Sequence, residues 1–491
     1  MTEPTTVHIV SLGCARNDVD SDELAGRLEA GGFRLVDEPA EAEAIVVNTC
    51  GFIESAKKDS IDTLLAASDL KGATTRRVVA VGCLAERYGR ELADALPEAD
   101  AVWGFDAYAD VDARLRALLA GEQQPAHVPA DRRRLLPLAP AGRPDAASEI
   151  VVPGLFQPQL LQPATDLPDL PAKAAPASGP RPVRRRLNPG PSAPVKIASG
   201  CDRRCAFCAI PSFRGSFVSR PVDDVVAEVR QLAAEGVREA FLVSENSTSY
   251  GKDLRDPDAL PRLLRELSAI KGLEWIRVSY LQPAEVRPGL IEAMCATPKV
   301  VPYFDLSFQH ASPTVLRRMR RYGSPEQFLG LLERIRSLAP DAGVRSNVIV
   351  GFPGETDADV DLLADFVAEA RLDALGVFAY SDEEGTEGAG LPDHVDADAI
   401  SERFERLSAL ASTLTDARAE ERVGERVRVL IEGREDADAV GRAAHQGPEV
   451  DGCVLVADPG GGLVAGDLIW GRVVASDGAD LIVERVADVD A

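Results

Sequence analysis

Short apolar runs alternate with amphipathic stretches over the first part of the chain, and this alternation predicts its elements. The apolar runs expected to be strands are Val7–Leu12, Ala44–Asn48 and Val78–Val81. Helical patterns follow them and end near Ala30, Ala67 and Leu96. Strands that alternate with helices form parallel sheets. We therefore expect an N-terminal parallel α/β domain over residues 1–120.

The alternation resumes at Val195 and predicts a larger α/β unit over residues 195–417. Six apolar runs are its expected strands: Val195–Ser199, Phe241–Ser244, Trp275–Ser279, Tyr303–Phe308, Ser346–Val350 and Leu375–Tyr380. The helical patterns between them include Val222–Glu235, Glu285–Ala296, Pro325–Leu338 and Ala358–Ala370. Six such units favour a partial TIM-like (β/α)6 barrel, whose active site lies at the carboxyl ends of the strands.

Residues 121–194 differ from both units because proline, alanine and glycine replace the alternating pattern. Two arginine runs, Arg132–Arg134 and Arg184–Arg186, fall in this stretch. Such a composition does not readily build a packed core. We therefore predict a linker or insertion in which the arginines are solvated, in preference to arginines that contact RNA.

The last part of the chain, residues 418–491, carries β-type runs without helical patterns. These runs are Val427–Glu432, Gly452–Val456, Leu468–Ala475 and Leu481–Val486. They predict a small all-β barrel. The fold class expected for the whole chain is thus α/β with a C-terminal all-β domain.

The chain is acidic, with a formal net charge of −25. This sign disfavours proteins that bind nucleic acid by neutralising its phosphates, and it favours basic partners. No apolar stretch reaches about 18 residues, the length needed for a membrane span. Met1–Val10 lacks the basic start and long apolar run of a secretory signal. We therefore expect a cytoplasmic protein that has no membrane span.

Three of the eight cysteines form a tight C-x₃-C-x₂-C motif just after the first predicted barrel strand. They are Cys201, Cys205 and Cys208. Three thiolates on one loop can bind three irons of a [4Fe–4S] cluster and leave the fourth iron open. A structural zinc site is the alternative, but such a site normally needs four ligands and no fourth one lies nearby.

Cys14, Cys50 and Cys83 each follow the end of a predicted N-terminal strand, and a glycine stands beside each of them. The carboxyl ends of parallel strands meet at one edge of a sheet, so these cysteines are expected to converge. We favour shared metal ligation over three separately buried thiols. Of the remaining cysteines, Cys295 is expected in a helix core, and Cys453 receives no role.

The three-cysteine motif at the top of a partial barrel resembles the radical-AdoMet superfamily. The resemblance implies that the open iron binds S-adenosylmethionine (AdoMet), and that an electron from the cluster cleaves it to a 5′-deoxyadenosyl radical. A low-potential donor of flavodoxin or ferredoxin type is expected to supply the electron. The turn with Gly351 and Gly354 is similar to the superfamily's adenine-binding motif. Glu245–Ser247 follow the second barrel strand, and this segment, with Asn246, is expected near the methionine end of AdoMet.

The succession of the three units resembles the methylthiotransferases over nearly the whole chain apart from the proline-rich stretch. In that family the N-terminal cysteines bind a second [4Fe–4S] cluster. The resemblance therefore assigns Cys14, Cys50 and Cys83 to a cluster that carries or donates sulfur. One AdoMet would supply the methyl group and another the radical, and the C-terminal barrel is similar to a TRAM domain.

Several motifs resemble the RimO-like branch of this family, which modifies the β-carbon of an aspartate in ribosomal protein S-12 of the small subunit. They are SLGCARN, TCGFIESA, AIPSFRG, FDLSFQH and YSDEEGT. The MiaB-like branch, which modifies tRNA adenosine, usually has a basic residue where Asp382–Glu384 stands. An acidic barrel mouth should attract a basic ribosomal protein and repel tRNA. We therefore predict a methylthiotransferase that acts on S-12.

Two alternatives stay open. One is a tRNA adenosine methylthiotransferase of the MiaB-like branch. The other belongs to a different class: a non-catalytic, metal-binding, ribosome-associated factor, which would bind zinc or a single cluster and would not cleave AdoMet. The chain also departs from the family pattern, since Ser244–Thr248 stand where Gln-Asp-Thr-Thr is common. This departure bears on the role expected for Asn246.

Overall fold

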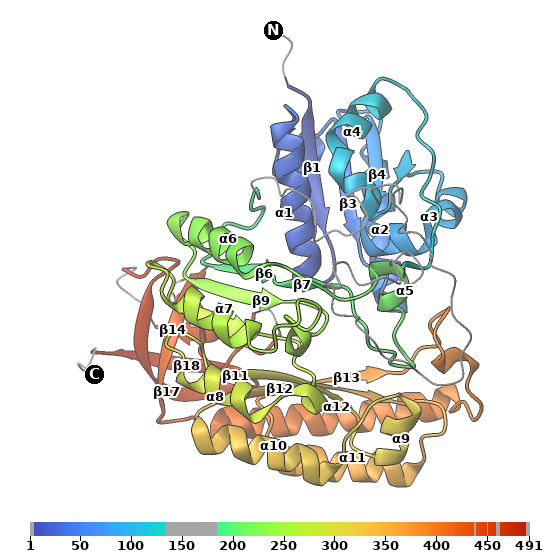
Figure 1. Cartoon of the computed structure of the whole chain (residues 1–491). Helices are drawn as coiled ribbons and strands as arrows, with labels where there is room; N and C mark the ends of the chain where they lie inside the picture. The colour runs from blue at the N-terminus through green and yellow to red at the C-terminus, as the bar shows by residue number, and fades with distance from the viewer. Residues whose placement is uncertain (1–3, 133–183, 437, 449, 458–461, 488–491) are drawn as a thin grey trace, which may run out of the picture.

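The chain folds into three units that follow one another in sequence (Figure 1). This computed structural model describes residues 4–132, 184–436, 438–448, 450–457 and 462–487. Most of the predicted insertion therefore lies outside the described residues. Within the described ranges, no helix combines the length and the apolar character that a membrane crossing requires.

The N-terminal unit is built on a parallel five-stranded sheet with the order β2-β1-β3-β4-β5. Its strands are β1 (Thr6–Ser11), β2 (Arg34–Leu35), β3 (Ala44–Thr49), β4 (Arg77–Val81) and β5 (Ala101–Val102). Its helices are α1 (Ala15–Ala30), α2 (Glu54–Asp69), α3 (Gly82–Ala95) and α4 (Val111–Leu119). Hydrophobic clusters lie on both faces of the sheet, which is why every residue of β3 is buried. The predicted parallel α/β domain is confirmed.

The central unit is a partial barrel of six parallel strands. Two three-stranded sheets, β6-β9-β10 and β11-β12-β13, meet through single bridges between β10 and β11. The strands are β6 (Ser192–Lys196), β9 (Glu239–Val243), β10 (Trp275–Val278), β11 (Tyr303–Gln309), β12 (Gly343–Val350) and β13 (Ala374–Ala379). A short hairpin, β7 (Ala198–Ser199) with β8 (Val218–Ser219), follows β6. The predicted partial barrel is confirmed.

Helices cover the outer face of this barrel, and the main hydrophobic core lies between them and the strands. They are α6 (Val222–Ala234), α7 (Ala259–Ser268), α8 (Pro288–Ala296), α9 (Pro313–Arg318), α10 (Pro325–Leu338), α11 (Asp357–Ala370) and α12 (Ala397–Glu420). A further short helix, α5 (Ile210–Arg214), follows the three-cysteine loop and lies beneath the N-terminal unit in Figure 1. The helical patterns did not indicate α7, α9 or α12.

The C-terminal unit is a closed five-stranded barrel with the order β14-β15-β16-β18-β17. Its strands are β14 (Arg426–Glu435), β15 (Asp438–Ala443), β16 (Val454–Val456), β17 (Leu468–Asp477) and β18 (Asp480–Val486). The predicted all-β barrel is confirmed, and β15 is the strand that its sequence did not reveal. Glycine and two charged residues interrupt the apolar pattern of β15.

Glu239 on β9 fastens the C-terminal barrel to the central unit. It accepts a 2.7 Å hydrogen bond from Arg277 Nε and pairs with Arg442 of β15, and all three side chains are buried. Arg277 also donates to Ala444 O at 2.9 Å. Burial raises the pKa of the Glu239 carboxyl, but the two arginines outweigh burial and hold it at about 2. The C-terminal barrel is therefore joined through buried charge.

Helix α1 joins the N-terminal unit to the barrel because it packs along β6. Its buried Asp20 pairs with Lys196 of β6, and its buried Asp22 accepts a 2.8 Å hydrogen bond from Arg184 Nε. The acidic start of this helix is thus an internal contact surface.

Arg132 and Arg184 contradict the prediction that the arginines of the insertion are solvated. Only 5% of Arg132 and 9% of Arg184 are exposed. Arg132 pairs with Glu86 at 2.5 Å and with Asp106 at 3.0 Å. Both arginines pair with carboxylates from other segments, and these ion pairs stabilise the packing of the units. Arg133 and Arg134 lie outside the described residues.

Candidate active site

Cys201, Cys205 and Cys208 lie on one loop between β7 and α5. The Cys201 N–H donates to Gly215 O at 3.0 Å, and the Cys208 N–H donates to Cys205 O at 3.1 Å. These bonds fix the two ends of the loop. The three cysteines line one cavity of about 600 Å³, together with the charged residues Asp202, Arg203, Arg204, Arg320 and Glu387. The structure therefore brings the predicted triad together.

These thiols are half-buried around the same cavity. Burial, with the neighbouring Cys205, raises the pKa of both Cys201 and Cys208 to about 12. Arg321 Nη1 approaches Cys205 Sγ at 3.8 Å. Without a metal Cys201 and Cys208 keep their protons, so binding a metal must release them. The donor set, three cysteines on one loop, fits a cluster that supplies compensating positive charge.

Cys14, Cys50 and Cys83 also converge, at the carboxyl edge of the N-terminal sheet. Cys14 precedes α1, Cys50 follows β3, and Cys83 lies in the first turn of α3. Gly13 has a φ of +98°, and a Cβ on it would lie 2.9 Å from Cys50 Sγ. Its lack of a side chain therefore lets Cys14 and Cys50 approach each other.

The charges around this second triad differ from one thiol to the next. Burial raises the pKa of the Cys14 thiol, but Arg16 and Arg214 outweigh burial and bring it below its ordinary 9.0. Burial raises the pKa of Cys83 to about 11 despite Arg214, and it also raises the pKa of Cys50. Cys14 is therefore the thiol of this triad that ionises first.

Arg214 reaches the N-terminal triad from the barrel. Its Nη2 lies 3.1 Å from Cys83 Sγ and donates to Asn17 Oδ1 at 2.8 Å, while its Nη1 lies 3.2 Å from Asp20 Oδ2. Arg214 ends α5, the helix that follows the other three cysteines. One short segment thus serves both triads.

Glu245 belongs to the segment expected near the methionine end of AdoMet, but its contacts with two arginines were not predicted. Its Oε1 is 3.4 Å from Arg16 Nη1 and 3.8 Å from Arg214 Nε. Arg16 Nη2 is in turn 3.7 Å from Cys14 Sγ. The available signal was the departure from the family pattern, because a glutamate stands where glutamine is common. Two buried arginines explain why a carboxylate occupies this position.

The three residues expected near AdoMet are placed at the barrel edge but are already engaged by protein. A Cβ on Gly351 would overlap Ile400, and one on Gly354 would overlap the Arg318 guanidinium, so each glycine permits close packing of the protein itself. Asn246 Nδ2 donates to Glu285 Oε2 at 3.1 Å. Direct contacts of these residues with AdoMet stay a prediction.

The burial of Glu383 contradicts the expectation that all of Asp382–Glu384 form an acidic barrel mouth. Glu383 is 5% exposed, and its carboxylate lies 2.8 Å from both Lys57 Nζ and Arg87 Nη1 of the N-terminal unit. Its negative charge therefore pairs with two cations across the contact between the units. Asp382 pairs with His394 at 3.2 Å, and Glu384 is exposed.

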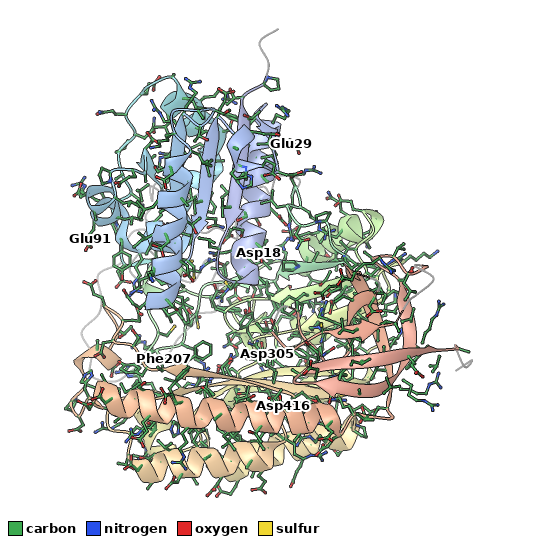
Figure 2. All side chains as sticks on the ribbon, turned by 180° about the vertical axis from the view of Figure 1, so that it is seen from behind. Asp18, Glu29, Glu91, Phe207, Asp305 and Asp416 are labelled. Carbon is green, nitrogen blue, oxygen red and sulfur yellow. The ribbon has the colours of Figure 1, made fainter. Side chains whose placement is uncertain are left out.

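Both triads lie near the contact between the N-terminal unit and the barrel, since Arg214, at the end of the helix that follows Cys208, reaches Cys83 Sγ. Figure 2 shows Phe207, from the loop between Cys205 and Cys208, in the space between these two units. Among the described residues, no three Cys, His, Asp or Glu side chains lie close enough to share one metal ion. In a cluster each thiolate binds a different iron, so wider spacing is compatible with two triads that each bind a cluster.

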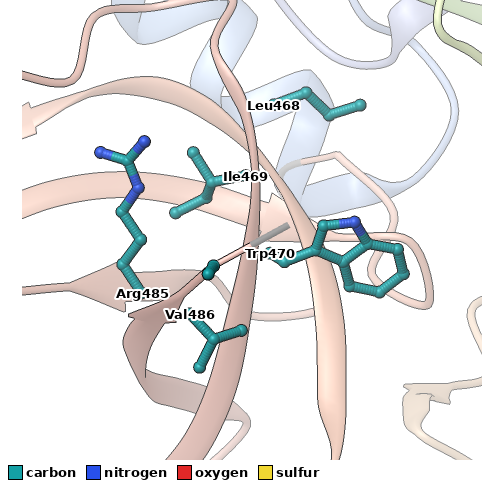
Figure 3. Close-up of a pocket in the computed structure, with 6 residues that line it drawn as sticks. Leu468, Ile469, Trp470, Arg485 and Val486 are labelled. Atoms are coloured by element: carbon teal, nitrogen blue, oxygen red, sulfur yellow. The ribbon is translucent and has the colours of Figure 1, made fainter. Parts of the chain in front are cut away.

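Other features lie apart from the triads. A cavity of about 270 Å³ on the C-terminal barrel is lined by Leu468–Trp470 and Arg485–Ala487 (Figure 3) and contains no thiol, carboxylate or imidazole. Cys295 is half-buried at the edge of the barrel core, as expected. The Cys453 N–H donates to Asp480 Oδ1 at 2.6 Å, and its thiol acquires no role.

Comparison with known families divides the chain as the fold does. Residues 6–104 match the Uncharacterized protein family UPF0004, residues 195–367 the Radical SAM superfamily, and residues 423–486 the TRAM domain. The second match implies AdoMet and one [4Fe–4S] cluster. The solved radical S-adenosylmethionine methyltransferase TsrM from Kitasatospora setae has a TM-score of 0.52 at 15% identity, and covers 77% of this chain and 75% of that one. At this identity it shows the fold alone.

Full-length relatives are far more similar. The ribosomal protein uS12 methylthiotransferase RimO of Cutibacterium acnes is 63% identical over 478 residues, which are 97% of each chain. The protein of the same name from Streptomyces coelicolor is 59% identical over 490 residues, covering 99% of this chain and 97% of the relative. This chain therefore belongs to the RimO family of radical-AdoMet methylthiotransferases.

Proposed function

We propose that this chain adds a methylthio group to the β-carbon of an aspartate in ribosomal protein uS12. The observation that carries the proposal is the presence of two cysteine triads near one contact between units, where Arg214 from the helix after Cys208 reaches Cys83 Sγ. Such a pair suits a reaction that needs both a radical source and a sulfur source. The near-complete alignment with relatives named as uS12 methylthiotransferases supports the same reading.

Each triad receives one cluster in this proposal. Cys201, Cys205 and Cys208 would hold the radical-AdoMet cluster, and Cys14, Cys50 and Cys83 the second one. When bound, these groups supply a 5′-deoxyadenosyl radical, sulfur and a methyl group. The chain positions them and excludes water from the space between them. We also assign AdoMet contacts to Asn246, Gly351 and Gly354.

Charge supports a protein substrate over tRNA. The chain has a formal net charge of −25, which favours encounter with a basic ribosomal protein and disfavours the phosphate backbone of tRNA. Since Glu383 is neutralised internally, the attraction must come from the acidic surface as a whole, to which exposed Glu384 contributes. A ribosomal substrate would place the reaction in the cytoplasm, with a flavodoxin-like or ferredoxin-like protein as electron donor.

The test is mass spectrometry of uS12 after anaerobic incubation with the reconstituted enzyme, AdoMet, sulfide and a reductant. A gain of one methylthio group on an aspartate is the expected result. The Cys205→Ala protein, treated identically, provides the matched control and should leave uS12 unchanged. Formation of 5′-deoxyadenosine with unmodified uS12 would contradict the substrate assignment and favour tRNA adenosine. Absence of AdoMet cleavage by the wild-type enzyme would contradict the reaction itself.

A further inference from the structure

Two arginines that contact thiols of the N-terminal triad share one buried glutamate. Arg16 extends from α1 toward Cys14, and Arg214 extends from the barrel toward Cys83. Glu245 lies between them, with its side chain only 2% exposed. These three residues come from three separate segments, so the folded structure alone creates the arrangement.

The surroundings of this group leave an excess of positive charge. Arg16, Arg214 and Lys196 are the buried cations, and Asp20 and Glu245 are the carboxylates that they contact. Three cations against two carboxylates leave one positive charge unbalanced beside Cys14 and Cys83. An iron–sulfur cluster held by three thiolates is anionic, and its reduction adds negative charge. The net charge near a cluster and the hydrogen bonds to its sulfurs set its reduction potential.

Glu245 is unusual because neither carboxylate oxygen has a hydrogen-bond partner among the described residues. Only the two arginines hold it in place, at 3.4 and 3.8 Å. A buried carboxylate without hydrogen bonds is costly unless its charge is needed where it stands. A glutamine at this position would avoid that cost but would leave both arginine charges acting fully on the thiolates.

We propose that Arg16, Glu245 and Arg214 are positioning residues that set the reduction potential of the N-terminal cluster. The inference rests on the second cluster of the proposed function. Arg214 and Arg16 stabilise the reduced, more negative cluster and so raise its potential. Glu245 opposes them and lowers it.

The test uses the full chain with Cys201, Cys205 and Cys208 all replaced by alanine, so that only the N-terminal cluster is present. After anaerobic reconstitution, a redox titration followed by electron paramagnetic resonance gives the midpoint potential without AdoMet or uS12. Glu245→Gln should raise the potential, and Arg214→Met should lower it. Each should change the ratio of reduced to oxidised cluster about tenfold at the parent's midpoint.

Opposite directions for the two variants are the signature of electrostatic control, because loosened packing has no reason to reverse its effect with the sign of the deleted charge. Arg214→Lys should recover part of the shift. Exposed Arg230→Met and Glu266→Gln are matched controls and should leave the potential unchanged. If Arg214→Met does not retain iron, Glu245→Gln and Arg214→Lys decide the question.

Unchanged potentials, or shifts in one direction for both charge deletions, would overturn the proposal while the parent retains its cluster. Failure of the parent to bind any iron would instead remove the second cluster, and this inference with it. Loss of uS12 modification in the otherwise intact enzyme is a separate result, since the titration requires no substrate.

Discussion

Replacing Glu239 by glutamine tests whether the C-terminal barrel depends on buried charge for its attachment. The carboxylate is fully buried between Arg277 and Arg442. Glutamine preserves the size of the side chain but removes the charge that both guanidinium groups require. Arg442 retains Glu432 at 2.7 Å, whereas Arg277 keeps only backbone and aromatic contacts. The variant should therefore be destabilised at this contact.

The magnitude follows from the pKa of Glu239. It falls from an ordinary 4.5 to about 2, because the two arginines outweigh the effect of burial. Each unit corresponds to about 1.4 kcal/mol, so the ionised carboxylate contributes about 3 kcal/mol. A lowered folded-state pKa gives stability that is complete above the unfolded value and lost as the pH falls. The difference between wild type and Glu239→Gln should be full at pH 7 and shrink between pH 4.5 and about 2.

Urea unfolding followed by tryptophan fluorescence provides the assay. The chain has three tryptophans, one in each unit, and Trp275 lies beside Arg277 with 3% exposure. Replacing Trp103 and Trp470 by phenylalanine makes Trp275 the single probe of this contact. The free energy of unfolding is then compared between variants at pH 7 and at a pH below the ordinary glutamate pKa of 4.5.

Glu274→Gln is the matched control because it breaks a second ion pair between the same two units. Glu274 and Arg428 lie 3.2 Å apart, but both are exposed. Exposed pairs contribute about 0–1 kcal/mol, so this change should have little effect. Equal losses for Glu239→Gln and Glu274→Gln, or a Glu239→Gln loss that does not change with pH, would refute the reasoning.

Three further changes address the triads and the contact between units. Cys205→Ala should abolish AdoMet cleavage, whereas Cys50→Ala should keep part of the cleavage and lose sulfur transfer. Chromatography of 5′-deoxyadenosine measures cleavage, and the mass of uS12 measures sulfur transfer. Equal loss of both activities in Cys50→Ala would argue against separate roles for the two triads. Gly82→Ala should cost more than about 1–2 kcal/mol, the cost of left-handed backbone strain alone, because at a φ of +92° an added Cβ would also lie 2.6 Å from Thr49 O. It should reduce the iron bound by the N-terminal triad, and an undiminished iron content would contradict this prediction. Glu383→Gln should speed hydrogen exchange in α2 about tenfold, measured by mass spectrometry, because Lys57 and Arg87 lose their shared carboxylate. The control, exposed Glu384→Gln, should leave the exchange rate unchanged. Equal exchange rates in the two variants would show that the Glu383 contact is unimportant.

Periodicity and position were enough to predict how the cysteines would gather. Each of Cys14, Cys50 and Cys83 follows a strand, and in a parallel sheet all strand ends of one kind share an edge. Their convergence therefore needed only the strands to be identified correctly. Five of the six strands of the central barrel were predicted in the same way from their apolar runs. The first, β6, begins at Ser192 and not at Val195, because its Ser-Ala-Pro start does not form an apolar run. Strands β2 and β5, at two residues each, are too short to produce a pattern.

The charged residues at the contacts between units could not be predicted in the same way. Asp20, Arg184 and Glu383 stand in polar stretches, and a polar stretch normally indicates solvent exposure. Each is buried because its partner comes from a distant part of the chain. Local patterning carries no information about such partners. The same limit hid the partners of Glu245, since Arg16 and Arg214 come from two other segments.

Helix α1 bears on how such enzymes can be recombined. It presents Cys14 at one end and buried carboxylates, Asp20 and Asp22, along the side that meets β6. A chimaera that took its N-terminal unit from one relative and its barrel from another would bring together carboxylates and cations that were never matched. Exchange should succeed only when Lys196, Arg184 and Arg214 travel with the helix. The boundary for modular exchange therefore runs through the barrel and not between the units.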